Sequence, residues 1–308
     1  MNHTEFNKKQ IIKYLVFTFV IAWIIQAIVG YLAAKAYLTV YQLIVMLMMI
    51  VPLTGVLFCR GSLKGMGWKP RFKGNVKLIL IAWFAPAVLT TVGAALYFLI
   101  FPGHFDLSGS FLLDTVGEDA LKQLEEQGLN YQLYLLITVI GCLTYAPLLN
   151  MFSAVGEEAG WRGFLYLQLK ARFSKRTAWL IGGVIWGAWH WPLIWLIGYE
   201  YGVEYFGFPV LGMLVFLFFT VSLGIISDWL YEKSKCIWVP SIFHGSINAA
   251  ATIPLAFAGA NSASTRLLGP VPNGLIAGLP IIIFAVILLI KAEDKESEKE
   301  KNDETETV

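Results

Sequence analysis

The sequence contains few charged residues for its length. Aspartate, glutamate, lysine and arginine make up 14% of the 308 residues, whereas 57% are hydrophobic. An average soluble protein contains about 25% charged residues. Apolar stretches of about 20 residues, each long enough to cross a ~30 Å hydrocarbon layer as a helix, recur along the chain. The composition therefore excludes an ordinary soluble domain and predicts an all-α, polytopic integral membrane protein.

The chain also lacks paired cysteines and a basic face. Cys59, Cys142 and Cys236 stand singly in or beside apolar runs, which excludes a Cys-x-x-Cys motif and a disulfide framework. The net charge is only +2, and the basic residues lie between apolar runs, so nucleic-acid binding is not expected. No repeat of fixed period is visible, and the pattern indicates no particular oligomeric state.

Eight apolar segments are predicted to be transmembrane helices. They cover residues 11–36, 38–59, 76–101, 131–155, 177–198, 208–231, 237–257 and 275–290. Lysine and arginine concentrate in alternate connections, while the connection 102–130 on the opposite side holds six acidic residues. Because basic residues favour the cytoplasmic side, we expect both termini to be cytoplasmic in a multi-pass protein of the cell membrane, surrounded by membrane lipid.

One apolar segment is too long for a single straight span. Residues 131–169 would form a helix of roughly 58 Å, about twice the hydrocarbon thickness. We expect this helix to break at Pro147 or at one of the glycines Gly156, Gly160 and Gly163. Residues 156–169 are then predicted to form a separate helical stretch near the cytoplasmic side.

The chain divides by composition into a membrane domain and a tail. The membrane domain covers residues 1–290, and its polar motifs lie between residues 157 and 248. Residues 291–308 alternate lysine with acidic residues and contain almost nothing apolar, so they cannot offset the entropy lost on folding. We predict a charged, disordered cytoplasmic tail.

Three charged residues interrupt the apolar pattern within six positions, namely Glu157, Glu158 and Arg162. Each ionised residue at the centre of a membrane helix costs roughly 2.5–3.5 kcal/mol on insertion scales. Glu158 and Arg162 are i and i+4 neighbours and can pair, whereas Glu157 points about 100° away on a helix. Either all three form a structural ion network near the interface, or Glu157 is left free for chemistry.

Two histidines, His190 and His244, also lie inside apolar runs. His244 and Asn248 are i and i+4 neighbours and share one helix face. A single histidine in a membrane helix is commonly a packing or hydrogen-bonding residue. Two histidines in the same chain as Glu157 and Asn248 favour a functional site.

These residue types suit the hydrolysis of a peptide bond. Water needs a base to act as a nucleophile at neutral pH, and an apolar environment makes a glutamate a stronger base by disfavouring its charged form. Arg162 opposes that effect by stabilising the ionised glutamate. Histidine and asparagine can donate hydrogen bonds to the oxyanion of a tetrahedral intermediate, and loss of one such donor costs on the order of 100-fold or more in rate.

The order and spacing of these residues resemble the CAAX-protease and bacteriocin-processing (CPBP) family of intramembrane proteases, which includes the type II CAAX prenyl endopeptidase and Abi-type membrane proteins. The resemblance rests on three motifs, Glu157-Glu158-x-x-x-Arg162, Trp186-x-x-x-His190 and His244-x-x-x-Asn248. It implies an intramembrane endopeptidase whose substrate is a peptide or a lipidated protein.

The resemblance also implies a role for each residue. Glu157 activates water with help from His190, Glu158 and Arg162 support the site, and the histidine and asparagine of the third motif stabilise the oxyanion. Trp186 departs from the family, which more often has phenylalanine at this position. We expect this departure to change the shape of the cavity and the fit of the substrate more than the chemistry.

Three alternatives stay open on the sequence. No cofactor is expected, but Glu157, His190 and His244 could bind zinc with water as the fourth ligand, although no His-Glu-x-x-His motif is present. A non-catalytic protein that binds a partner, such as an immunity protein against a peptide toxin, is a second alternative. A transporter that uses Glu157 and His190 as a proton relay is a third.

Overall fold

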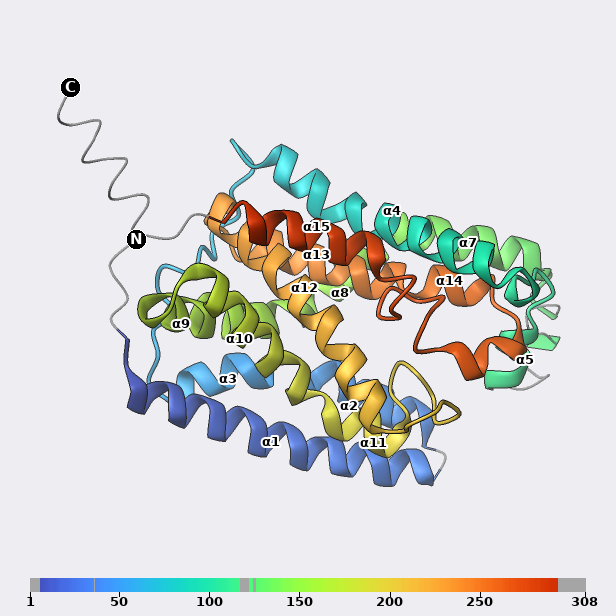
Figure 1. Cartoon of the computed structure of the whole chain (residues 1–308), viewed down its shortest axis with the longest axis horizontal. Helices are drawn as coiled ribbons and strands as arrows, with labels where there is room; N and C mark the ends of the chain where they lie inside the picture. The colour runs from blue at the N-terminus through green and yellow to red at the C-terminus, as the bar shows by residue number, and fades with distance from the viewer. Residues whose placement is uncertain (1–5, 36, 117–121, 124–125, 293–308) are drawn as a thin grey trace.

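The computed structural model describes residues 6–35, 37–116, 122–123 and 126–292, which form a bundle of helices (Figure 1). This part of the chain contains no β-strand, and its one β-type contact is an isolated bridge between Phe105 and Ala258. The predicted all-α fold class is therefore confirmed. Beyond Ala292 the predicted tail lies outside the described residues.

The described helices follow one another through mostly short connections. The first part of the chain forms α1 (Lys8–Ala34), α2 (Leu38–Met48), α3 (Val51–Phe58), α4 (Val76–Ile100), α5 (Ser110–Val116) and α7 (Tyr131–Leu143). The second part forms α8 (Ala146–Gly160), a π-helical turn (Trp161–Leu165), α9 (Tyr166–Arg172), α10 (Lys175–Trp189), α11 (Trp191–Ile197), α12 (Val210–Ser234), α13 (Trp238–Ala250), α14 (Thr252–Ala256) and α15 (Leu279–Ile290). Short 3-10 turns cover Pro102–His104 and Ala260–Thr265.

Among the described residues, four helical segments are long and apolar enough to cross a membrane, namely α1, α4, α10 with α11, and α12. The number rises to six if the bent pair α2–α3 and the bent unit α7–α9 each count as one span. The apolar helix α15 and the buried helix α13 are shorter. Each of the eight predicted segments therefore contains helix and the polytopic membrane class is confirmed, while the count of eight spans stays a prediction.

The long segment 131–169 bends, as expected, but the break lies earlier than residue 156. The two helical parts meet at 50° between α7 and α8. Pro147 lies in the first turn of α8, where a helix does not need the N–H that proline lacks. The predicted separate stretch over 156–169 is wrong, because α8 continues to Gly160 and passes directly into the π-helical turn.

The glycines of α8 bring it close to a neighbouring segment and do not break it. A Cβ atom added to Gly156 would lie 2.7 Å from the carbonyl oxygen of Met49 and 2.8 Å from the Cα of Ile50. A Cβ atom on Gly160 would collide with Pro52. Since glycine allows close backbone approach, α8 packs directly against α3 and the bend before it.

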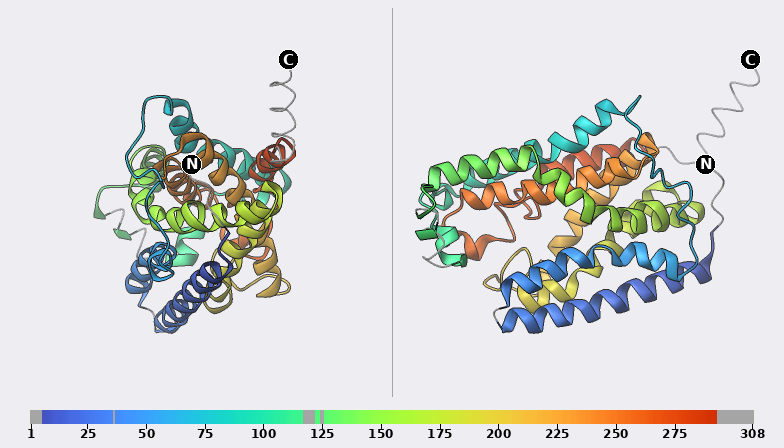
Figure 2. Two further views of the ribbon diagram at one scale, coloured as in Figure 1. Left: turned by 90° about the vertical axis from the view of Figure 1, so that its left-hand side faces the viewer. Right: turned by 180° about the vertical axis from the view of Figure 1, so that it is seen from behind.

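The middle of the bundle is built around α13, which packs against α8, α4 and α12 (Figures 1 and 2). Helix α10 packs against α12, and α1 runs along the outside, where it contacts α2, α3 and α11. The start of α1 and the end of α15 lie at the same end of the bundle (Figure 1). This packing holds α8, α13 and the junction of α10 with α11 around one buried region.

Candidate active site

The buried region contains a cavity of about 70 Å³. Glu157 of α8, His190 at the end of α10, and His244 and Asn248 of α13 all line it. The four residues predicted to be catalytic therefore lie around one space, although up to 91 residues separate them along the sequence. One water molecule needs roughly 10–15 Å³, so the cavity has room for a few water molecules but not for a peptide.

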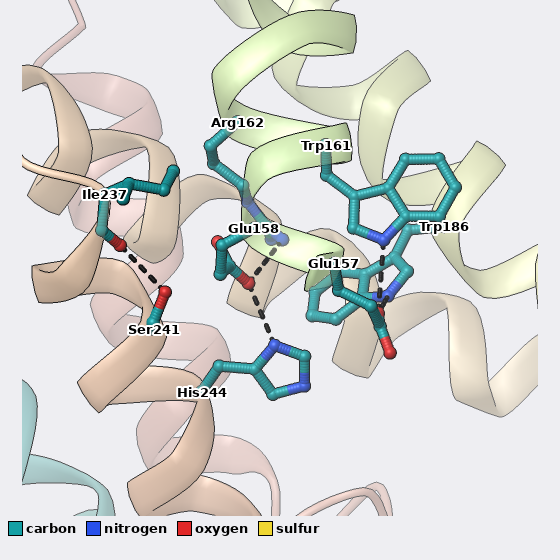
Figure 3. Close-up of polar contacts among 8 residues, drawn as sticks. All are labelled: Glu157, Glu158, Trp161, Arg162, Trp186, Ile237, Ser241 and His244. Atoms are coloured by element: carbon teal, nitrogen blue, oxygen red, sulfur yellow. Dashed lines mark hydrogen bonds and ion pairs between the residues drawn. The ribbon is translucent and has the colours of Figure 1, made fainter. Parts of the chain in front are cut away.

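Two tryptophans hold one oxygen of Glu157. Its Oε2 accepts hydrogen bonds from Nε1 of Trp161 at 3.1 Å and from Nε1 of Trp186 at 2.6 Å. Figure 3 shows the two bonds converging on this oxygen, while the second oxygen points away from both indoles. The carboxylate is 2% exposed, so the two N–H donors replace the water that it has lost. They leave Oε1 as the oxygen that can act on another molecule.

Glu158 and Arg162 form the i, i+4 ion pair expected from the sequence. Oε1 of Glu158 accepts from Nη1 of Arg162 at 2.9 Å, and both side chains are fully buried (Figure 3). The guanidinium carbon lies 4.3 Å from the ring centre of Trp186 and 5.2 Å from that of Tyr166. Removing one partner of such a buried ion pair strongly destabilises a folded protein, because the other charge stays buried without a partner.

His190 lies at the break between α10 and α11. Its Nδ1 lies 3.0 Å from the carbonyl oxygen of Trp186. A carbonyl only accepts, so Nδ1 carries the hydrogen, and Nε2 of the neutral ring has a free lone pair. The rings of Trp189, Tyr199 and Phe216 surround the imidazole at centroid distances of 4.7, 6.1 and 5.1 Å. His190 is therefore held in one orientation with Nε2 able to accept a proton.

Gln26, a buried glutamine of α1, hydrogen-bonds to the backbone at the break between α10 and α11. Nε2 of Gln26 donates to the carbonyl oxygen of Trp189 at 2.8 Å, and its Oε1 accepts from the backbone N–H of Leu193 at 3.2 Å. These two backbone groups lie on either side of His190, where the regular helix is interrupted. The amide thus gives the buried carbonyl of Trp189 a donor, and it gives the N–H of Leu193 a second acceptor beside the carbonyl oxygen of His190.

His244 and Asn248 approach the cavity from one face of α13. Nδ1 of His244 lies 2.9 Å from Oε1 of Glu158, and its ring contacts the ring of Trp186 edge-on at 5.3 Å between centroids (Figure 3). With Nδ1–H donated to the carboxylate, Nε2 carries a hydrogen only when the ring is doubly protonated. The amide of Asn248 is exposed and makes no side-chain hydrogen bond within the described residues, so it is available as a neutral donor.

Four contributors were absent from the prediction made on sequence. Trp161 could have been found, because it follows Glu157 by four residues on the same helix. Gln26 could also have been noticed as a lone amide in the first apolar run. Tyr199 and Glu200, which line the cavity, follow a left-handed glycine in an irregular loop, and the sequence contains no signal for their position.

The donor set proposed for zinc does not come together in this arrangement. Within the described residues, no three side chains of histidine, cysteine, aspartate or glutamate are placed to hold one metal ion. His190 also donates its Nδ1–H to a backbone carbonyl, and one oxygen of Glu157 is already held by two indoles. A site made from Glu157, His190 and His244 would therefore need these side chains to move.

Part of the chain that contains this site is similar to known proteins. Residues 138–250 match the family model described as type II CAAX prenyl endopeptidase Rce1-like. Over 101 residues the chain is 36% identical to CAAX prenyl protease 2 of Methanococcus maripaludis, which corresponds to 32% of this chain and 37% of that protein. The chain thus matches little more than a third of the length of this curated relative. Residues 138–250 include all three motifs, so the similarity covers the part of the chain on which the resemblance to the CPBP family rests.

Proposed function

We propose that this protein is an intramembrane endopeptidase in which Glu157 activates water for attack on a peptide bond. The observation that carries this proposal is that Glu157, His190, His244 and Asn248 all line one cavity large enough for water. A base, a second proton acceptor and two hydrogen-bond donors are the groups that hydrolysis requires. The family match over residues 138–250 supports the same reaction class.

The hydrolytic step begins at the free oxygen of Glu157. Oε1 removes a proton from a water molecule in the cavity, and Nε2 of His190 accepts a hydrogen bond from the same water and orients it. The water oxygen then bonds to the carbonyl carbon of the peptide, whose oxygen becomes an oxyanion. Oε2 stays bound to the two indoles throughout, so the carboxylate does not rotate.

The oxyanion is stabilised from α13. The side-chain N–H of Asn248 donates to it, and Nε2 of His244 also donates when both ring nitrogens carry a hydrogen. Collapse of the intermediate breaks the C–N bond, and the proton held by Glu157 passes to the departing amine. The products are a carboxylic acid and an amine, and Glu157 is ionised again.

We further propose a prenylated protein C-terminus as the substrate. The matched relative is named as a CAAX prenyl protease, and apolar side chains such as Leu193, Phe219 and Leu223 form part of the cavity wall. A cavity of about 70 Å³ has to widen before a peptide can enter. Met48 and Met49 form its wall at the 42° bend between α2 and α3, and this bent pair is the segment most suited to move aside.

Cleavage of defined peptides by the purified protein tests the proposal. A fluorogenic farnesylated peptide and its unprenylated twin are incubated with the protein in detergent, with and without a zinc chelator, and mass spectrometry identifies the bond that is cut. We expect cleavage of the farnesylated peptide that survives chelation and is lost in Glu157→Ala. Cleavage that the chelator abolishes would show a metal enzyme, and absence of cleavage of either peptide would contradict the endopeptidase and favour a partner-binding protein.

A further inference from the structure

Glu200 is a second carboxylate of the cavity, and the hydrolytic mechanism does not use it. It lies in the loop between α11 and α12 and lines the same space as Glu157 and His190. The ring of its neighbour Tyr199 lies parallel to the imidazole of His190, with 6° between the planes and 6.1 Å between the centroids. A group bound at Glu200 would therefore lie beside the residues that activate water.

The backbone at Glu200 has a conformation that glutamate rarely adopts. Its φ is +69°, in the left-handed region, between Gly198 at +63° and Gly202 at +71°. The two glycines reach this region without a Cβ clash, whereas Glu200 is held in it by the surrounding loop. Strained backbone of this kind is common where a side chain is aimed at a functional site.

One oxygen of Glu200 is anchored. Nδ2 of Asn273, a residue that is 4% exposed, donates to Oε2 of Glu200 at 2.7 Å. The backbone carbonyl of Asn273 in turn accepts from the hydroxyl of Tyr201 at 2.9 Å. No lysine or arginine in the part of the chain that the structure describes forms an ion pair with this carboxylate.

The charge of Glu200 is only partly compensated. Burial raises the pKa of Glu200, while Tyr199, Arg266 and Asn273 lower it by less, so the pKa lies above its ordinary value. The ionised carboxylate thus has fewer stabilising partners than it would have in water. Such a group gains most from a ligand that brings a positive charge and an N–H donor.

We propose that Glu200 forms a subsite that binds a basic side chain of the substrate next to the scissile bond and disfavours an acidic one. This inference rests on the proposed endopeptidase function. A lysine or arginine of the substrate donates a charge-assisted hydrogen bond to Oε1, while Oε2 stays on Asn273. An aspartate or glutamate at the same position meets a like charge and binds less well.

Pairs of peptides that differ by one residue test this subsite. Lysine and glutamate are exchanged at each position within three residues of the cleaved bond, and kcat/KM is measured for each pair. We expect the wild-type protein to prefer lysine at one position, and Glu200→Gln to reduce this preference about tenfold, mainly through KM. Glutamine keeps the size of the side chain and can still accept from Asn273, so the fold is preserved.

Glu204 provides the matched control. It is exposed in the same loop and does not line the cavity, so Glu204→Gln removes the same charge without touching the subsite. The preference for lysine should be unchanged in this variant. If Glu200→Gln keeps the wild-type preference, or if Glu204→Gln lowers it equally, the subsite is wrong while the endopeptidase stands. If the wild-type protein cuts no peptide, the endopeptidase and the subsite both fail.

Discussion

Trp161 and Trp186 determine which oxygen of Glu157 is available for chemistry. Both indole N–H groups bind Oε2, so the carboxylate has one held oxygen and one free oxygen (Figure 3). Trp186 was expected to alter the shape of the cavity and the fit of the substrate more than the chemistry. The structure shows that its N–H contacts the base directly, a contact that the phenylalanine more common in the family cannot make. In the proposed mechanism Trp186 therefore acts as a positioning residue for Glu157.

Replacement of Trp186 by phenylalanine should separate this role from packing. The ring that covers Arg162 and His244 stays, while the N–H bonded to Glu157 is lost. We expect kcat to fall about 10- to 100-fold with KM within about twofold, because a misplaced base is costly even when the substrate binds normally. Steady-state kinetics with the fluorogenic peptide measures both constants.

Trp179→Phe is the matched control for this variant. Trp179 lies in the same helix, is buried, and donates its N–H to Oδ2 of Asp228 at 2.6 Å, and it does not line the cavity. It should lose some stability and keep a kcat near wild type. An equal loss of kcat in both variants would show that Trp186 acts only through packing.

Gln26→Leu should lower the stability of the folded protein. The change removes the amide that binds the carbonyl of Trp189 and the N–H of Leu193, and both backbone groups stay buried. Leaving a buried polar group without a partner costs about 1–3 kcal/mol. We expect a lower midpoint of thermal unfolding in detergent. An unchanged midpoint would mean that water or a rearranged loop replaces the amide.

The sequence identified residues that the structure brings around one cavity, but it could not supply most of their contacts. Glu158 with Arg162, and His244 with Asn248, are i, i+4 pairs, so their relation followed from helix geometry. The contacts of Glu157 with Trp186 could not be derived, because they depend on how α8 packs beside α10. The position of Glu200 depends on a loop whose path no periodic pattern encodes.

The close contact between α8 and the bend before α3 determines the position of Glu157. Gly156 precedes Glu157 and lies against the backbone of Met49 and Ile50, so α8 can approach only because this residue has no side chain. From the sequence, a helix break was expected at Pro147 or at one of these glycines, because glycine is a flexible residue that weakens helices. The contacts of Gly156 and Gly160 with the neighbouring segment show that both instead allow two helical segments to pack closely.

Gly156→Ala should therefore displace α8. The added Cβ would lie 2.7 Å from the carbonyl oxygen of Met49, and backbone atoms cannot move aside as a flexible side chain can. We expect destabilisation of about 1–3 kcal/mol, as for other overpacked sites, and at least a tenfold lower kcat/KM. Thermal unfolding and peptide cleavage measure the two effects.

Gly103→Ala controls for the exchange itself, since a Cβ atom there meets nothing within 4 Å. This variant should match the wild-type protein in both assays. Wild-type stability and activity in Gly156→Ala would show that α8 and the bend separate easily, and that the glycine does not position Glu157.

The first and the last helix of the described chain have their outer ends on the same side of the bundle. The start of α1 and the end of α15 lie at one end of the molecule (Figure 1), an arrangement that requires an even number of crossings. The distribution of lysine and arginine predicts that this end is cytoplasmic. The all-α membrane class could be derived from composition and apolar runs alone. The number of spans could not, because α13 and α15 are short and two spans are bent.

Reporter fusions test this orientation. A fluorescent protein that matures only in the cytoplasm, joined to either terminus, should fluoresce. An alkaline phosphatase that is active only outside the cytoplasm should be active when inserted into the connection 102–130. Phosphatase activity from a fusion at either terminus would contradict the predicted orientation.

The chemical role of Glu157 can be measured in one experiment. Glu157→Gln keeps the size of the side chain and its hydrogen bonds from the two indoles but removes the base. With Glu204→Gln as the folded control, kcat/KM for the peptide that the wild-type protein cleaves is compared in purified samples of equal thermal stability. Because a positioned general base contributes roughly 100- to 10,000-fold, we expect a loss of at least about 100-fold in Glu157→Gln alone. Activity within about tenfold of wild type would contradict hydrolysis by glutamate-activated water.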